Sequence, residues 1–78
     1  MTLEDINKHI GKHICLVIPL HRRTTVAIWG DLSSDEDPLT NEIMFNVSYR
    51  DEIARFPLND IHAVEISEKY GIVIRLTN

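Results

Sequence analysis

The sequence predicts a mostly-β chain that forms one small barrel of about five strands, with a short helix at the N-terminus. Three observations point to this fold class. Apolar residues recur with period two in several short runs, tight turns separate most of these runs, and Gly30 interrupts one run where a small barrel needs a bend. A chain of 78 residues is too short to divide, so residues 1–78 are expected to form a single domain.

A short helix is expected at the beginning of the chain. Thr2 can cap its first turn, and Asp5, three residues later, can complete a capping box. Three apolar side chains would share one face of this helix, namely those of Leu3, Ile6 and Ile10. Gly11 is placed to end the helix, because glycine readily adopts the left-handed conformation that follows a last helical turn.

Five runs then alternate between apolar and other residues, as strands with one buried face do. They span residues 14–20, 26–32, 43–49, 54–58 and 72–76. The dipeptide Arg50–Asp51 would form one tight turn, and Lys69–Gly71 would form another, in which Gly71 can take a positive φ. The segment 33–41 between the second and third runs is a long polar loop.

The connection after the fourth run is also informative. Pro57 cannot donate a hydrogen bond to a sheet, so it belongs at a strand end or edge. The dipeptide Asn59–Asp60 favours a tight turn. An apolar stripe then resumes at Ile61, Val64 and Ile66. This succession of strand, tight turn and strand resembles the way in which the last strands of SH3-like and Sm-like barrels are joined.

The composition favours a soluble protein of the cytoplasm. Cys15 is the only cysteine, so no disulfide can form within the chain, and its place in an apolar run suits a buried thiol in a reducing compartment. The sequence shows neither a signal peptide nor an apolar run long enough to cross a bilayer, so no membrane partner is expected. The formal net charge of −4 argues against a protein that coats nucleic acid through its overall electrostatic field.

The segment Gly30–Leu32 is followed, after a loop, by Asp37–Asn41 and then by an apolar strand. In this order the motifs resemble the first motif of the Sm and Sm-like family, over residues 11–45. The resemblance implies an N-terminal helix, a bent five-stranded barrel and a loop that shapes a pocket for a base of single-stranded RNA. The chain departs from the family in three ways: its loop is one residue longer, Thr40 replaces a methionine, and residues 56–61 lack the family's Arg-Gly pair.

A second apolar set alternates away from the predicted core. It comprises Cys15, Val17, Ala27, Trp29, Met44, Ile53 and Val73. One interpretation is a surface for a partner protein or for self-association, centred on Trp29 and extended by Met44, Val17 and Val73. The other is that a small curved barrel has no clean inside and outside, and that the N-terminal helix covers part of this set.

Two segments could contact RNA. Under the Sm-like resemblance, Asp37 and Asn41 stand where the family's loop shapes the pocket for a base. The only basic cluster consists of His21, Arg22 and Arg23, which could contact phosphate. The alternatives are that Asp37 caps a turn within a solvated loop, and that the basic cluster is an ordinary charged hairpin tip.

Catalytic, cofactor and metal sites are not expected. His9 and His13 have the spacing of helical metal ligands, but Gly11 lies between them and no further residue completes a set of four. The acidic residues 31–37 lack the spacing and the central glycine of a calcium loop. The sequence contains no phosphate-binding loop and no nucleophile elbow, and Cys15 within a buried strand would be inert.

The sequence therefore favours a non-enzymatic binding module that acts through a protein-interaction or regulatory surface around Trp29. The alternative is an Sm-like oligomeric RNA-binding protein that uses the Asp37–Asn41 loop and the His21–Arg23 turn. A homo-oligomer, with a dimer favoured over a ring, is expected because the core is small and apolar residues face outward. Its interface would involve either the terminal strand 72–76 or the strand that carries Trp29.

Overall fold

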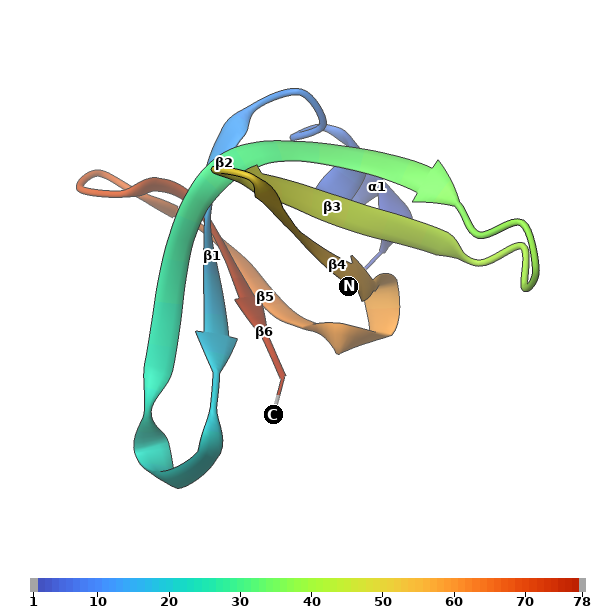
Figure 1. Ribbon diagram of the computed structural model, residues 1–78. Helices are drawn as coiled ribbons and strands as arrows, with labels where there is room; N and C mark the ends of the chain where they lie inside the picture. The colour runs from blue at the N-terminus through green and yellow to red at the C-terminus, as the bar shows by residue number, and fades with distance from the viewer. Residues whose placement is uncertain (1, 78) are drawn as a thin grey trace.

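A computed structural model describes residues 2–77, except for the side chain of Arg22. Within these residues it contains a six-stranded mixed sheet, one short α-helix and two 3-10 helices (Figure 1). The elements are α1 (Leu3–Asn7), β1 (His13–Pro19), η1 (His21–Arg23), β2 (Thr25–Glu36), β3 (Ile43–Tyr49), β4 (Glu52–Pro57), η2 (Leu58–Asp60), β5 (Ile61–Ser67) and β6 (Gly71–Leu76). In the described part of the chain, no helix has the length and apolar character needed to cross a membrane.

The strands lie in the order β4-β3-β2-β1-β6-β5. Neighbouring strands are antiparallel, except that β1 and β6 run parallel. A tight turn that contains Gly71, with a φ of 73°, joins β5 to β6, as predicted. In residues 2–77 no ladder joins the two outer strands, β4 and β5, so the sheet is open.

The prediction of a mostly-β fold with one short N-terminal helix is confirmed, and each of the five predicted runs belongs to a strand. The number of strands and the closure differ from the prediction. The stripe at Ile61, Val64 and Ile66 belongs to a sixth strand, β5, and the sheet is not closed into a barrel. The physical reason is that β6 occupies the position beside β1 that the strand after η2 would need in order to close the sheet.

Strand β2 contains 12 residues and belongs to two parts of the sheet. Residues 25–31 pair with β1, and residues 31–36 pair with β3. Gly30 lies at this change of partner, where a Cβ atom would overlap the carbonyl oxygen of Ser48. The predicted bend is visible as the curve of β2 over the molecule (Figure 1). We call β5, β6, β1 and the first part of β2 the four-stranded half, and the second part of β2 with β3 and β4 the three-stranded half.

The two halves enclose one apolar core on the concave side of the curved sheet. Its buried side chains are those of Ile6, Ile14, Leu16, Leu32, Phe45, Val47, Phe56, Ile61 and Ile74. The rings of Phe45 and Phe56 stack with their centroids 6.1 Å apart. Because Ile6 comes from α1, the helix covers this core. The interpretation in which the helix covers part of the outward apolar set is therefore wrong.

The beginning of α1 has the predicted capping box. The backbone N–H of Thr2 donates to Asp5 Oδ2 at 2.8 Å, and its hydroxyl donates to the same oxygen at 2.9 Å. These two bonds lower the pKa of Asp5, because they favour the ionised carboxylate. Gly11 has a φ of 85°, and its N–H donates to the carbonyl of Leu32 at 2.7 Å, which ties the helical segment to β2.

Candidate interaction surface

The outer face of the four-stranded half is apolar along neighbouring strands. Trp29 of β2 lies opposite Cys15 of β1, and Cys15 lies opposite Val73 of β6. In the next row Ala27 of β2 lies opposite Val17 of β1. Opposed residues point to the same face of a sheet, with Cβ atoms about 5 Å apart. The side chains of Trp29, Val17 and Val73, which the sequence assigned to a partner surface, are therefore brought together.

Tyr70, in the turn between β5 and β6, extends this surface. Its ring centroid lies 6.3 Å from that of Trp29, with an angle of 49° between the ring planes, which is a favourable arrangement for two aromatic rings. Trp29 is 43% exposed and Tyr70 is 50% exposed, whereas Cys15 and Val73 are buried. We define the outer patch as the exposed or partly exposed Val17, Ala27, Trp29 and Tyr70, with Cys15 and Val73 as its floor.

The thiol of Cys15 is a structural part of the outer patch. Burial raises its pKa, and the positive charge of Arg75 offsets this rise only in part. Burial has this effect because surroundings of low dielectric constant disfavour the thiolate. The neutral thiol packs as a small apolar group, which is the inert role that the sequence predicted for it.

Two polar pairs flank the outer patch on the same face. His13 Nδ1 lies 3.1 Å from Asp31 Oδ1 on one side. On the other side, Arg75 Nε donates to Glu65 Oε1 at 3.1 Å. The first pair is largely exposed and the second is about half exposed, so both contribute little to stability. They give the apolar patch a polar rim.

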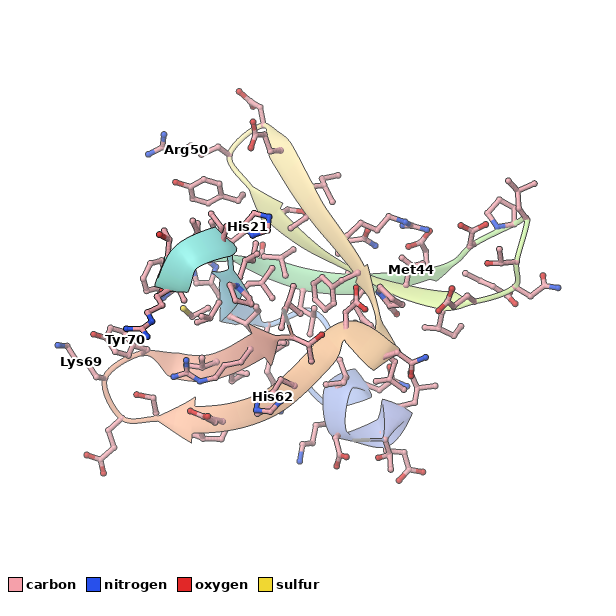
Figure 2. The ribbon with its side chains drawn as sticks, turned by 90° about the horizontal axis from the view of Figure 1, so that it is seen from below. His21, Met44, Arg50, His62, Lys69 and Tyr70 are labelled. Carbon is pink, nitrogen blue, oxygen red and sulfur yellow. The ribbon has the colours of Figure 1, made fainter. Side chains whose placement is uncertain are left out.

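Met44 does not belong to the outer patch, although the sequence grouped it with Trp29. It lies opposite Asp35 of β2, and Asp35 is six positions beyond Trp29, up to about 20 Å along an extended strand. Figure 2 accordingly shows Met44 and Tyr70 on different parts of the molecule. The bend at Gly30 separates the two regions, and alternation along β2 could not reveal that separation.

The outer face around Met44 is polar. Arg55 Nη1 donates to Asp35 Oδ1 and, at 3.0 Å, to Asn46 Oδ1. Asn46 Nδ2 also donates to Asp35 Oδ1, at 2.8 Å. The bonds from Arg55 and from Asn46 lower the pKa of Asp35. We call Asp35, Asn46 and Arg55 the polar network of the three-stranded half.

The loop predicted to shape an RNA pocket closes on itself. Asp37 Oδ1 accepts a hydrogen bond from the N–H of Leu39 at 2.8 Å. The N–H of Asp37 donates to the carbonyl of Glu42 at 2.8 Å, and that of Asn41, which has a φ of 60°, donates to the carbonyl of Asp37 at 2.8 Å. Asp37 therefore caps a turn, which is the alternative that the sequence offered.

The predicted basic site lies at the other end of β2. His21 and Arg23 belong to η1, between β1 and β2, and are exposed, whereas the side chain of Arg22 lies outside the described part of the structure. Figure 1 shows η1 and the 37–41 loop at opposite ends of the long strand β2. These two segments consequently do not form one site.

A cleft of about 410 Å³ lies between α1 and β5, on the concave side and away from the outer patch. It is lined by Asp5, Lys8, His9, Val64 and Ile66. His9 is only 6% exposed, and its Nδ1 atom has no hydrogen-bond partner among the described residues. Burial, reinforced by the charges of Lys12 and Lys8, lowers the pKa of His9, so its imidazole is neutral at neutral pH. The sequence gave no sign of this cleft, because the packing of a helix against a distant strand leaves no repeating pattern in the sequence.

Comparison with protein-family models, with curated proteins and with solved structures finds no match to this chain. The resemblance to the Sm-like family therefore stays a prediction. Among the described residues, no group of three or more histidine, cysteine or acidic side chains is arranged to hold a metal ion. Function is accordingly inferred from the surfaces of the molecule.

Proposed function

We propose that the protein is a non-enzymatic binding module that engages a partner protein through the outer patch. The observation that carries this proposal is the pair of half-exposed aromatic rings, Trp29 and Tyr70, next to the buried Cys15 and Val73. Aromatic side chains supply a large apolar contact area at a low cost in conformational entropy. For this reason they are enriched among the residues that dominate the binding energy of protein interfaces.

The distribution of charge favours a protein over RNA as this partner. The chain carries a net charge of −4, whereas affinity for nucleic acid depends on several cations that each contact a phosphate. Lys69 lies beside the aromatic pair, with its Nζ atom 5.2 Å from the centroid of the Tyr70 ring. Arg75 is already paired with Glu65, whose charge offsets its own.

The RNA-binding alternative takes a different form once the fold is known. It would use Trp29 and Tyr70 to stack on unpaired bases and Lys69 to contact phosphate. The Asp37–Asn41 loop and the His21–Arg23 turn would contribute at most separately, because they lie at opposite ends of β2.

We further propose a distant relationship to SH3-like and Sm-like barrels and a cytoplasmic location. The bent strand β2 and the one-turn connection η2 support the relationship, while the position of β6 between β1 and β5 sets this chain apart. A reducing compartment would preserve the unpaired thiol of Cys15.

The proposal is tested by capturing partners from a cell extract with the full chain and then measuring the affinity of each purified partner by calorimetry. We expect Trp29→Ala to weaken binding by about 30-fold, because the truncation of a central interface aromatic typically costs about 2 kcal/mol or more. Leu39→Ala is the control, since Leu39 is exposed but lies in the 37–41 loop at the far end of β2. It should leave the affinity unchanged.

Two outcomes would decide against a protein partner at the outer patch. If Trp29→Ala is folded and retains the affinity of the unmodified chain for every captured protein, the patch is not the binding surface. If a short single-stranded RNA binds with an affinity that falls steeply with salt, and Trp29→Ala abolishes that binding, the RNA-binding alternative is correct.

A further inference from the structure

The two strands that the sequence offered as self-association edges differ in their surroundings. The terminal strand β6 is flanked by β1 and β5, so its backbone groups are occupied by neighbouring strands on both sides. The strand that carries Trp29, β2, pairs with β1 over residues 25–31 and with β3 only over residues 31–36, so its first part keeps one open side. The two outer strands of the sheet, β4 and β5, each pair with a single neighbour in residues 2–77.

These two edges differ in how well they are protected against pairing with another strand. β4 ends at Pro57, which removes one backbone donor, and it carries Arg55 and Glu52. Proline and charged residues at an edge are common defences against strand addition. β5 contains no proline, its acidic residue Glu65 is paired with Arg75 of the neighbouring β6, and its only irregularity is a register shift between Ile61 and Ala63, next to His62. From Ala63 to Ser67 its outer edge is regular and open.

Apolar side chains accompany the open edge of β5. Val64 and Ile66 line the cleft between β5 and α1, and Ile66 is 73% exposed. A protruding isoleucine thus stands beside a hollow of about 410 Å³. The other wall of the cleft carries Asp5 and Lys8, two side chains of opposite charge on consecutive turns of the helical segment.

This combination is self-complementary. A surface that contains both a projection and a hollow, and both signs of charge, can match a second copy of itself across a two-fold axis. A twofold arrangement can place Asp5 of one copy near Lys8 of the other, and the reverse. A partner of a single charge or of uniform shape would match only part of this surface.

We propose that two copies of the chain associate through their β5 strands, which pair antiparallel and extend the two sheets into one. Opposed residues of antiparallel strands share a face, so Val64 and Ile66 of both copies lie together on the concave side. The exposed Ile66 side chain of each copy enters the cleft of the other. The outer patch is on the opposite face and remains free, so this interface is independent of the proposed partner-binding function.

The molar mass of the full chain in solution, measured by light scattering after gel filtration, tests this interface. We expect the mass of two chains at about 100 μM, since a small strand-pairing interface belongs to the weak end of stable association. Ile66→Lys should return the protein to a monomer by raising the dissociation constant at least about tenfold. The matched control is Ile53→Lys on β4, because Ile53 is 66% exposed at the other edge of the sheet. Circular dichroism establishes that both variants are folded.

Amide hydrogen exchange of the unmodified chain provides a second readout. Residues 63–67 should exchange more slowly as the concentration rises into the dimeric range, while residues 52–57 of β4 should not change. Trp29→Ala should remain dimeric. A monomeric wild-type chain at this concentration, or a dimer that Ile53→Lys or Trp29→Ala disrupts while Ile66→Lys does not, would overturn the proposal. A monomeric chain, or a dimer that Ile53→Lys disrupts, would leave the proposed binding of a partner to the outer patch untouched, whereas a dimer that Trp29→Ala disrupts would assign the outer patch to self-association.

Discussion

The two halves of the sheet are built alike on the concave side and differently on the outer side. Both contribute alternate apolar residues to one core, such as Leu16 in the four-stranded half and Phe45 in the three-stranded half. On the outer side, the four-stranded half presents the outer patch, whereas the three-stranded half presents the polar network. Alternation thus assigns a residue to a face, but the bend at Gly30 decides which outward residues become neighbours.

The largest effect is expected where the two halves meet. In Gly30→Ala the added Cβ atom would overlap the backbone carbonyl of Ser48, and backbone cannot move aside as cheaply as a flexible side chain. We expect a loss of about 3 kcal/mol or more in the free energy of unfolding, as for severe overpacking. Urea denaturation measures this loss. A loss smaller than about 1 kcal/mol would show that the halves can separate at the bend without strain.

Gly71→Ala is the matched control for that experiment. Position 71 also favours glycine, but for a different reason. Its φ is 73°, and no heavy atom lies within 4 Å of the position that a Cβ atom would take. A left-handed conformation costs an alanine about 1–2 kcal/mol. The effect should therefore be smaller than that of Gly30→Ala.

A smaller effect distinguishes the outer faces of the two halves. A double-mutant cycle of Trp29→Ala and Tyr70→Ala should give a coupling of about 1 kcal/mol in the free energy of unfolding, as for other aromatic pairs. The same cycle with Asp35→Ala and Arg55→Ala should give a smaller coupling, since both side chains are solvent-exposed. A coupling in the polar network that equals or exceeds the aromatic one would reverse the comparison.

Acidification should affect the cleft between α1 and the four-stranded half before it affects the three-stranded half. Because burial lowers the pKa of His9 below 6.5, the unfolded chain binds its proton at a higher pH than the folded chain does. The stability that depends on a neutral His9 is therefore present above pH 6.5 and is lost as the pH decreases below that value. His9→Leu should lose less stability over this range than the unmodified chain does, measured by thermal denaturation at a series of pH values. Equal losses in the two proteins would show that His9 is hydrated in solution.

The smallest effect is expected in the polar network at lower pH. The hydrogen bonds from Arg55 and Asn46 lower the pKa of Asp35 below 3.8, so its contribution is present above that pH. The contribution is lost as the pH falls through the depressed pKa of the folded state. Asp35→Asn should remove this dependence while leaving the loss below pH 6.5, which we assign to His9, in place. The same series of thermal denaturation measurements checks it.

Local features of the fold could be predicted from the sequence. The capping box of Thr2 and Asp5, the turn at Gly71 and the Asp37 cap each depend on residues within a few positions of one another. The period-two runs located the strands, because alternation follows from one buried face. The bend at Gly30 was also predictable, since a glycine inside a strand commonly marks one.

The pairing of strands could not be predicted, because it depends on contacts between distant parts of the chain. Nothing in residues 72–76 indicates that they lie parallel to β1, so the closure of the sheet and the position of residues 72–76 at an edge were wrong in prediction. Tyr70 was missed for a related reason: it lies in a turn, where no periodicity applies, and reaches Trp29 only through that parallel pairing. Trp29, Val17 and Val73 were correctly placed on one face, because they lie on the outer side of neighbouring strands in the same or adjacent rows.

The position of β6 also has a consequence for the order of folding. Within residues 2–77, β6 follows the other five strands along the chain, yet it lies between β1 and β5. Strands β1 to β4 form a meander of sequence neighbours that can assemble as soon as residue 57 is available, whereas β1 and β5 are joined only when the last strand arrives. Pairing between strands so distant in the chain is slow, because a long loop must close first. Until then the side of β1 that pairs with β6 is exposed, and Trp29 lacks its contact with the ring of Tyr70. In that interval the chain is most vulnerable to aggregation.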